Sequence, residues 1–212
     1  MINTIIFDFG GVLLNLDYSK TDAALKQIFQ SQLIEDDQFP PALTDLFLQV
    51  EKGRIDPTQF IRGLKSFLPD DITDQRLIDA WNAMLGNFPK SRLKMLQRLS
   101  KSFQLFLLSN TNAIHIQHVH THLKEDHGII DFEEKFFDDT FYSHLIGMRK
   151  PDTDIYKYVL DRVKRKPEEI IFIDDTKVNL EVPNSLGVHC IHHNPANDIA
   201  LIIDQYIDTC SS

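Results

Sequence analysis

The chain has 212 residues, of which 42% are hydrophobic and 25% are charged, so it can form one sizeable core with a small appended domain. Its formal net charge of -9 repels a phosphate backbone, which argues against a nucleic-acid partner. Two cysteines without metal-site spacing fit a reducing cytoplasm, and no apolar run is long enough to span a bilayer. We therefore expect a cytoplasmic protein without membrane or nucleic-acid partners that acts on a small molecule. Its oligomeric state stays open, with a monomer as the simplest case.

The first predicted element covers residues 4–9, a nearly all-apolar run that is rich in β-branched and aromatic side chains. This pattern is typical of a strand that is buried on both faces of a parallel sheet. Asp8 lies near its end, and Gly10 and Gly11 follow. Open α/β sheets place their chemistry at such a strand end, and glycines let the backbone approach a ligand. Taken alone, Asp8 could equally cap the turn.

Residues 15–86 carry helical periodicity with few β-branched runs. Pro40-Pro41 separates the first two expected helices, and Asp56-Pro57 begins the third with a capping residue and a proline at the first helical position. Pro69-Asp70-Asp71 ends that third helix. We expect about four helices here, near residues 23–29, 43–50, 57–68 and 77–85. The sequence thus predicts a helical block inserted directly after the first strand.

From residue 87 onwards, predicted strands and helices alternate. We expect helices over 89–101 and 152–165, and strands over 104–108, 136–142, 170–173 and 188–191. This alternation indicates an α/β fold, a doubly wound, mostly parallel Rossmann-like sheet with an inserted helical cap. The core domain would comprise residues 1–14 and 87–212, and the cap residues 15–86. Right-handed crossovers would bring the strand ends to one edge of the sheet.

Four polar clusters then fall at or after strand ends: Asp8, Ser109-Asn110, Lys150 and Asp174-Asp175. Each fits a role in phosphoryl transfer. Asp8 can attack phosphorus as a nucleophile, and Lys150 can supply a compact positive charge to the phosphate and to Asp8. The Ser109 hydroxyl and the Asn110 N–H, at the expected start of a helix, can bind phosphate oxygens. Each cluster alone is more often a helix cap or a solvated loop, so their joint occurrence carries the argument.

A phosphate ester is anionic and would be repelled by bare carboxylates, so we expect a divalent cation between them. All-oxygen ligands favour Mg²⁺. We expect Asp8 and Asp175 as direct ligands, with the backbone carbonyl of Gly10 as a third, while Asp174 either ligates the ion or supports the ligands. Gly11 joins Ser109, Asn110 and Lys150 as a candidate for phosphate binding.

Four segments together carry a resemblance to the haloacid dehalogenase-like (HAD) hydrolase superfamily, to the subfamily whose cap follows the first strand. They are Phe7-Asp8-Phe9-Gly10-Gly11-Val12, Leu108-Ser109-Asn110-Thr111-Asn112, Gly147-Met148-Arg149-Lys150-Pro151 and Phe172-Ile173-Asp174-Asp175. The stretch over 108–186 resembles the bacterial glucose-1-phosphate phosphatase group. The resemblance implies a Mg²⁺-dependent phosphatase with Asp8 as nucleophile, and Mg²⁺ held by Asp8, the Gly10 carbonyl and Asp175.

One position departs from the family pattern. Most family phosphatases and phosphomutases have a second aspartate two residues after the nucleophile as general acid/base, where this chain has Gly10. Loss of such an acid costs about 10²–10⁴ in rate. The leaving group could be intrinsically good, a cap residue or water could replace the acid, or the protein could be catalytically weak. We expect a phosphatase of a small phosphorylated metabolite, with a sugar phosphate as one candidate. The alternatives are a metal-independent dehalogenase and a binding module.

The four histidines at positions 115, 118, 120 and 122 lack a cysteine or carboxylate at a familiar metal-site spacing. We expect them on a solvated surface segment. His192-His193 follows the last strand, near the active edge. Asp17, Tyr18, Trp81 and Asn82 are candidates for the cap side of the pocket, and the sequence does not say which of them face it.

Overall fold

A five-stranded parallel sheet is the centre of the molecule. The computed structural model describes residues 1–29, 39–69 and 71–211. The strand order is β3-β2-β1-β4-β5, and every neighbouring pair is parallel. The strands are β1 (Thr4–Phe7), β2 (Gln104–Ser109), β3 (Asp139–Tyr142), β4 (Ile170–Asp174) and β5 (His189–His192). The expected α/β fold with a Rossmann-like sheet is confirmed.

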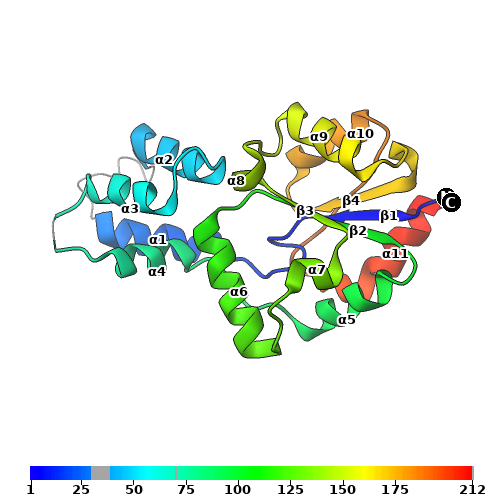
Figure 1. Ribbon diagram of the computed structural model, residues 1–212, viewed down its shortest axis with the longest axis horizontal. Coiled ribbons are helices and arrows are strands. Elements are labelled where there is room, and N and C mark those ends of the chain that lie inside the picture. The colour runs from blue at the N-terminus through cyan, green and yellow to red at the C-terminus, as the bar shows by residue number, and fades with distance from the viewer. Residues whose placement is uncertain (30–38, 70, 212) are drawn as a thin grey trace.

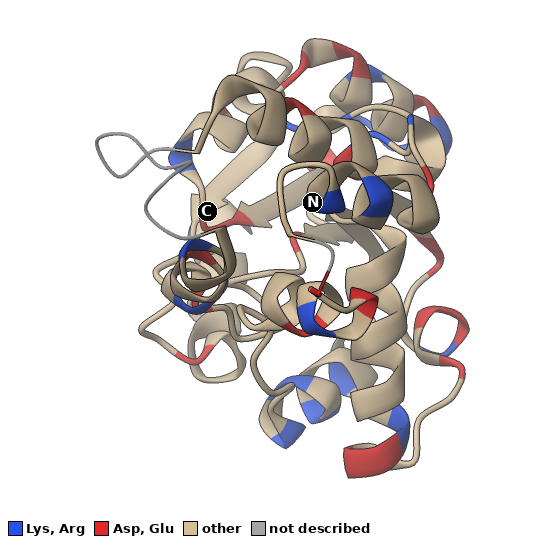
Figure 2. Ribbon diagram, turned by 90° about the vertical axis from the view of Figure 1, so that its left-hand side faces the viewer, with Lys and Arg blue, Asp and Glu red and all other residues tan. Residues whose placement is uncertain are grey.

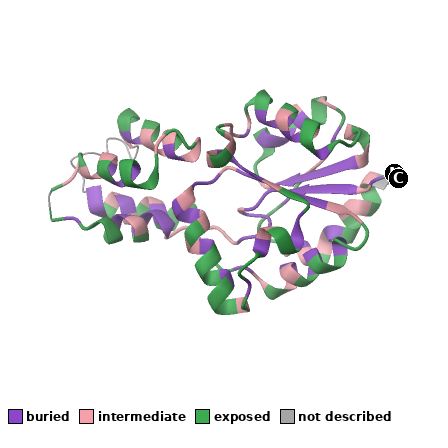
Figure 3. Cartoon of the chain, viewed as in Figure 1, coloured by how far each residue is buried: buried purple, intermediate pink, exposed green. Residues whose placement is uncertain are grey.

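Helices cover both faces of the sheet, as expected for a doubly wound fold (Figure 1). Side chains alternate along each strand, so Ile5 and Phe7 pack on one face while Ile6 packs on the other. The first face is covered by α5 (Lys90–Leu99), α6 (Ala113–His127), α7 (Phe132–Phe136) and α11 (Ile199–Ser211). The second is covered by α9 (Thr153–Val163) and α10 (Glu181–Ser185). The central strands β1, β2 and β4 are therefore buried, while the outer helices expose one side (Figure 3).

Four helices form a separate block at the left of Figure 1: α1 (Tyr18–Phe29), α2 (Pro41–Glu51), α3 (Pro57–Lys65) and α4 (Asp74–Asn82). They bury their own apolar cluster, which includes Leu25, Leu43, Phe60 and Leu77. The start of α3 follows the expected signals, because the Asp56 side chain accepts from the Gln59 N–H in a capping box. This cluster lets the block keep its own core beside that of the sheet.

Several boundaries differ from expectation. The first strand ends at Phe7 and not at residue 9, and the aromatic run before β3 is a short helix, α7, so that only Asp139–Tyr142 is strand. The region with four histidines, expected to be helical or irregular, is the long helix α6, whereas the C-terminal helix α11 was not expected. Asp70, part of the expected break after α3, lies outside the described residues.

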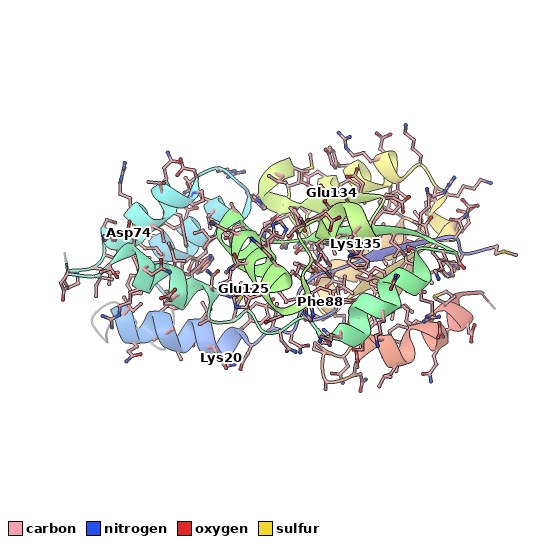
Figure 4. All side chains as sticks on the ribbon, turned by 60° about the horizontal axis from the view of Figure 1, so that its bottom comes forward. Lys20, Asp74, Phe88, Glu125, Glu134 and Lys135 are labelled. Carbon is pink, nitrogen blue, oxygen red and sulfur yellow. The ribbon has the colours of Figure 1, made fainter. Side chains whose placement is uncertain are left out.

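The remaining short elements are α8 (Ser143–Ile146) and two 3₁₀ helices, Pro167–Glu169 and Lys177–Leu180. Among the described residues, no helix is both long enough and apolar enough to cross a bilayer. Charges of both signs are interspersed over the helices (Figure 2). Exposed side chains such as Lys20, Asp74 and Glu125 project outward from them (Figure 4).

Candidate functional site

The register of the sheet brings the acidic residues of two strands together. Phe7 on β1 pairs with Ile173 on β4, so Asp8 lies beside Asp174 where the two strands end. The Asp8 N–H donates to the Ile173 carbonyl at 2.8 Å. Carboxylate oxygens of Asp8, Asp174 and Asp175 all lie within 4.8 Å of one another. The sheet edge therefore carries three converging carboxylates, as the sequence suggested.

Lys150 lies in the middle of this cluster and is almost completely buried. Its Nζ donates to Asp8 Oδ1 at 2.7 Å and to Asp174 Oδ2 at 2.6 Å. Burial alone would lower the pKa of this ammonium, but the two carboxylates outweigh burial and raise the pKa above its usual value. Lys150 therefore stays charged, and it offsets part of the repulsion among the carboxylates.

The Asp8 carboxyl is also buried, and burial raises its pKa to about 7. Lys150 acts against this shift, while Asp174 and Asp175 add to it. Burial likewise raises the pKa of Asp175, and Asp174 contributes to that increase. A cluster of one ammonium and three carboxylates thus carries excess negative charge, which a bound cation would relieve.

The Asp174 carboxylate is held by protein donors on both oxygens. Its Oδ1 accepts from the Thr176 N–H at 2.8 Å and from Asn179 Nδ2 at 3.1 Å, and its Oδ2 accepts from Lys150. Asn179 is buried and was not among the residues singled out from the sequence. These contacts suit Asp174 to positioning Lys150, and they leave Asp8 and Asp175 with the freer oxygens.

The Ser109-Asn110 stretch does not begin a helix, and that expectation was wrong. Ser109 is the last residue of β2, and α6 begins at Ala113, capped by the Asn112 side chain. Asn110 instead holds the backbone of the loop that carries Lys150, because its Oδ1 accepts from the Lys150 N–H and its Nδ2 donates to the Lys150 carbonyl, each at 2.8 Å. Both Ser109 and Asn110 still line the cavity beside Asp8.

Gly11 has a positive φ of 73°, and a Cβ there would lie 2.1 Å from Asp175 Oδ2. Its N–H donates to the Leu14 carbonyl at 2.8 Å. Glycine at this position therefore lets the Asp175 carboxylate approach the backbone. At Gly10, a Cβ would lie 2.3 Å from Leu16 Cδ1, so the Leu16 side chain fills the space that a second aspartate would enter.

A cavity of about 430 Å³ opens over Asp8 and Asp175 between the sheet edge and the helical block. The helical block contributes four prominent lining residues, Tyr18, Phe47, Glu51 and Trp81, of which sequence analysis had named Tyr18 and Trp81. The other two candidates, Asp17 and Asn82, are not among the residues that line it.

Polar contacts hold the C-terminal end of α2 against the α/β domain. Glu51 pairs with Arg149 at 2.9 Å, and Lys52 pairs with Asp152 at 2.8 Å. The Ser143 hydroxyl donates to the Glu51 carbonyl at 2.7 Å. Both ion pairs therefore join the helical block to the loop that carries Lys150.

The expectation of a solvated histidine segment fails for His115, which is buried and lines the cavity. His120 and His122 are exposed and His118 is half-buried, in line with that expectation. His192 is the last residue of β5, so the expectation that it follows the strand was wrong; it is exposed, whereas His193, directly after the strand, is fully buried. Helical periodicity does not separate His115 from His122, which lies two turns further along nearly the same face of α6; His115 is buried because Trp81 and Asn82 pack on it.

Comparison with known proteins agrees with this geometry. The family model described as haloacid dehalogenase-like hydrolase matches residues 2–187. D-ribitol-5-phosphate phosphatase of Bacteroides thetaiotaomicron is 26% identical over 191 residues, 88% of this chain and 89% of the relative. A sesquiterpene phosphatase of Aspergillus oryzae is 28% identical over 191 residues, 88% of this chain and 87% of the relative. A magnesium complex of a HAD family enzyme from B. thetaiotaomicron superposes with a TM-score of 0.84 at 30% identity, covering 95% of this chain and 98% of that one.

Proposed function

This chain belongs to the haloacid dehalogenase-like hydrolase family, and from that premise we propose that it hydrolyses small phosphate monoesters through an aspartyl-phosphate on Asp8 with the help of Mg²⁺. The observation that carries the proposal is the buried Lys150, which bridges Asp8 and Asp174 at the floor of the cavity. Burying a charge network of this kind costs free energy, so its presence favours a functional role. Phosphoryl transfer needs both a nucleophile held in place and a positive charge beside it.

The residues present fit a magnesium ion. Asp8 and Asp175 offer carboxylate oxygens close together, the Gly10 backbone carbonyl follows Asp8 by two residues, and oxygen ligands suit Mg²⁺. We propose these three as ligands, with Asp174 supporting them through Lys150. When bound, the ion would neutralise the carboxylates and the phosphate oxygens. The magnesium complex of the related HAD enzyme supports magnesium as the ion.

In the proposed reaction, an Asp8 oxygen attacks phosphorus and the bond from phosphorus to the ester oxygen breaks, with the electron pair leaving on the alcohol oxygen, which takes up a proton. Water then attacks the aspartyl-phosphate and releases inorganic phosphate and free Asp8. Lys150 orients Asp8 and stabilises the charge on the phosphoryl oxygens. The Ser109 hydroxyl and the Asn110 N–H complete the phosphate end of the cavity.

The helical block over residues 15–86 serves in this proposal as a cap that closes the cavity and contacts the leaving group. Leu16 fills the space beside Gly10, so the proton for the leaving oxygen comes from elsewhere than position 10. The helical block contributes much of the wall around the leaving group, which gives it the choice of substrate.

The direct test is Asp8→Asn, compared with Asp17→Asn as the matched control on an exposed carboxylate. Phosphate release from p-nitrophenyl phosphate is measured with Mg²⁺ and with excess chelator. We expect Asp8→Asn to lose about 10³-fold or more of the activity, and Asp17→Asn to keep it. Activity retained by Asp8→Asn would refute the assignment of Asp8 as the nucleophile. Activity that survives complete chelation would refute the role of the metal ion.

A further inference from the structure

His115 is fixed from two sides by α4 of the helical block. Its ring stacks on Trp81, with an interplanar angle of 10° and a centroid distance of 5.2 Å. Its Nδ1 lies 2.9 Å from Asn82 Oδ1, in a buried hydrogen bond across 33 residues. Trp81 therefore sets the plane of the ring, and Asn82 sets its rotation within that plane.

These contacts determine what the ring offers to a ligand. The Asn82 amide oxygen can only accept a hydrogen bond, so His115 Nδ1 carries the proton and Nε2 is left with a lone pair. Burial, with a smaller contribution from His118, lowers the pKa of His115 to about 3, so the ring is neutral at physiological pH. Nε2 has no hydrogen-bond partner among the described residues, although the side chain is more than nine-tenths buried and lines the cavity.

Two other polar side chains in this part of the cavity are already engaged, whereas Trp81 Nε1 is a buried donor without a hydrogen-bond partner among the described residues. Asn112 Oδ1 accepts from the N–H groups of residues 114 and 115, and Glu51 is paired with Arg149. Much of the remaining wall is apolar, formed by Leu14, Leu16, Phe47, Met84, Leu85, Ile116 and Val119. A wholly apolar ligand would therefore leave the His115 acceptor buried and unpaired, which is unfavourable.

The cavity has room for a small phosphate ester, because its volume of about 430 Å³ lies within the range of ordinary small-molecule sites.

Building on the proposed phosphatase function, we propose that His115 Nε2 accepts a hydrogen bond from a hydroxyl group of the leaving alcohol, so that the preferred substrates are phosphate monoesters of small polyhydroxylated alcohols. His115 would thus be a residue that determines specificity at the distal end of the cavity. The sugar-alcohol phosphate in the name of the Bacteroides relative belongs to the same chemical class.

The first experiment uses the unaltered protein with Mg²⁺ and two substrates of equal chain length, a pentitol 5-phosphate and 1-pentyl phosphate. We expect kcat/KM to be about 10- to 100-fold higher for the pentitol ester, because the alkyl ester leaves the acceptor unpaired. Equal values, or a preference for the alkyl ester, would overturn the inference. p-Nitrophenyl phosphate serves as the reference: if none of the three esters is hydrolysed, the proposed function itself fails, whereas hydrolysis of all three at similar rates sinks only the role of His115.

The second experiment changes the ring. His115→Phe keeps an aromatic ring to stack on Trp81 but has no nitrogen acceptor. We expect the preference for the pentitol ester to collapse towards one, mainly through a higher KM for that substrate. A purely structural role would lower the activity on both esters in parallel and leave the preference intact. His122→Phe, at an exposed position two turns further along the same helix and outside the cavity, is the matched control and should keep the preference of the unaltered protein.

Discussion

Gly11→Ala tests whether glycine is needed there to make room for the Asp175 carboxylate. The new Cβ would lie 2.1 Å from Asp175 Oδ2, more than 1 Å short of ordinary contact, so the carboxylate has to move. Mg²⁺ requires near-ideal geometry, so a ligand displaced by about 1 Å is lost, and we expect a 10- to 100-fold weaker Mg²⁺ affinity. An alanine held at this positive φ of 73° also adds a strain of about 1–2 kcal/mol to the folded protein.

Gly128→Ala separates these two effects. Gly128 ends α6 with a φ of 67°, and nothing lies within 4 Å of the position of a new Cβ. Gly128→Ala therefore has the same backbone strain as Gly11→Ala, but its new Cβ collides with no other atom. Urea unfolding should show both variants destabilised by about 1–2 kcal/mol, whereas a Mg²⁺ titration of phosphate release should shift for Gly11→Ala alone. An equal Mg²⁺ requirement in the two variants would refute the reasoning.

Three further outcomes follow from the same contacts. Gly10→Asp should lower the free energy of unfolding by about 1–3 kcal/mol, and adding Leu16→Ala should reduce this loss, as measured by urea unfolding. The double variant Gly10→Asp with Leu16→Ala should also hydrolyse alkyl phosphates with a higher initial rate than Gly10→Asn with Leu16→Ala. Asp174→Asn should lower the free energy of unfolding by about 3 kcal/mol, because it leaves buried Lys150 with one carboxylate. His115 has a folded pKa of about 3 against an ordinary 6.5, so the unfolded chain binds this proton more readily, and stability should fall below pH 6.5 by up to about 1.4 kcal/mol per pH unit. His115→Phe should lack that contribution in unfolding measured from pH 7 to pH 5.

Each of these has its own control or contrary result. For the double variant, equal rates with aspartate and asparagine at position 10 would show that no acid acts there. Asp74→Asn removes an exposed partner of Lys65 and should cost less than about 1 kcal/mol, so a similar loss for Asp174→Asn would contradict the buried network. Parallel pH slopes for the unaltered protein and His115→Phe would show that this ring titrates normally.

The sheet could be predicted from the sequence because its strands are short apolar runs with polar residues directly after them. Once the strands were assigned, a parallel sheet predicted that Asp8 and Asp174 lie at the same edge, and the structure shows that their strands are neighbours, with Phe7 paired to Ile173. The helical block was likewise visible in its periodicity and in the capping signal at Asp56. These features are local, and local signals are what a single sequence carries.

The start of α6 shows where such reasoning stops. Ser109, Asn110, Thr111 and Asn112 are four successive candidates for a helix cap, and nothing local chooses among them. The structure chooses Asn112, because Ser109 still belongs to β2 and the Asn110 side chain is bonded to the Lys150 backbone, forty residues away.

Long-range contacts explain the other omissions at the site. Asn179 holds Asp174 through a turn that follows the strand, and His115 becomes a cavity residue only because Trp81 and Asn82 arrive from α4. The filling of the space beside Gly10 by Leu16 also depends on how the chain enters the helical block. Composition and periodicity contain none of these pairings, which arise from packing.

Two consecutive cations link the helical block mechanically to the nucleophile. Arg149 forms an ion pair with Glu51 at the end of α2, while its neighbour Lys150 forms an ion pair with Asp8. The Glu51–Arg149 pair is more exposed than the Lys150 pairs, so rising ionic strength weakens it more than it weakens them. In the proposed phosphatase, an opening movement of the helical block would break this ion pair and the pair of Lys52 with Asp152. Higher ionic strength would then favour opening of the helical block, and so faster entry of substrate and release of product, while the buried contacts of Lys150 stay in place.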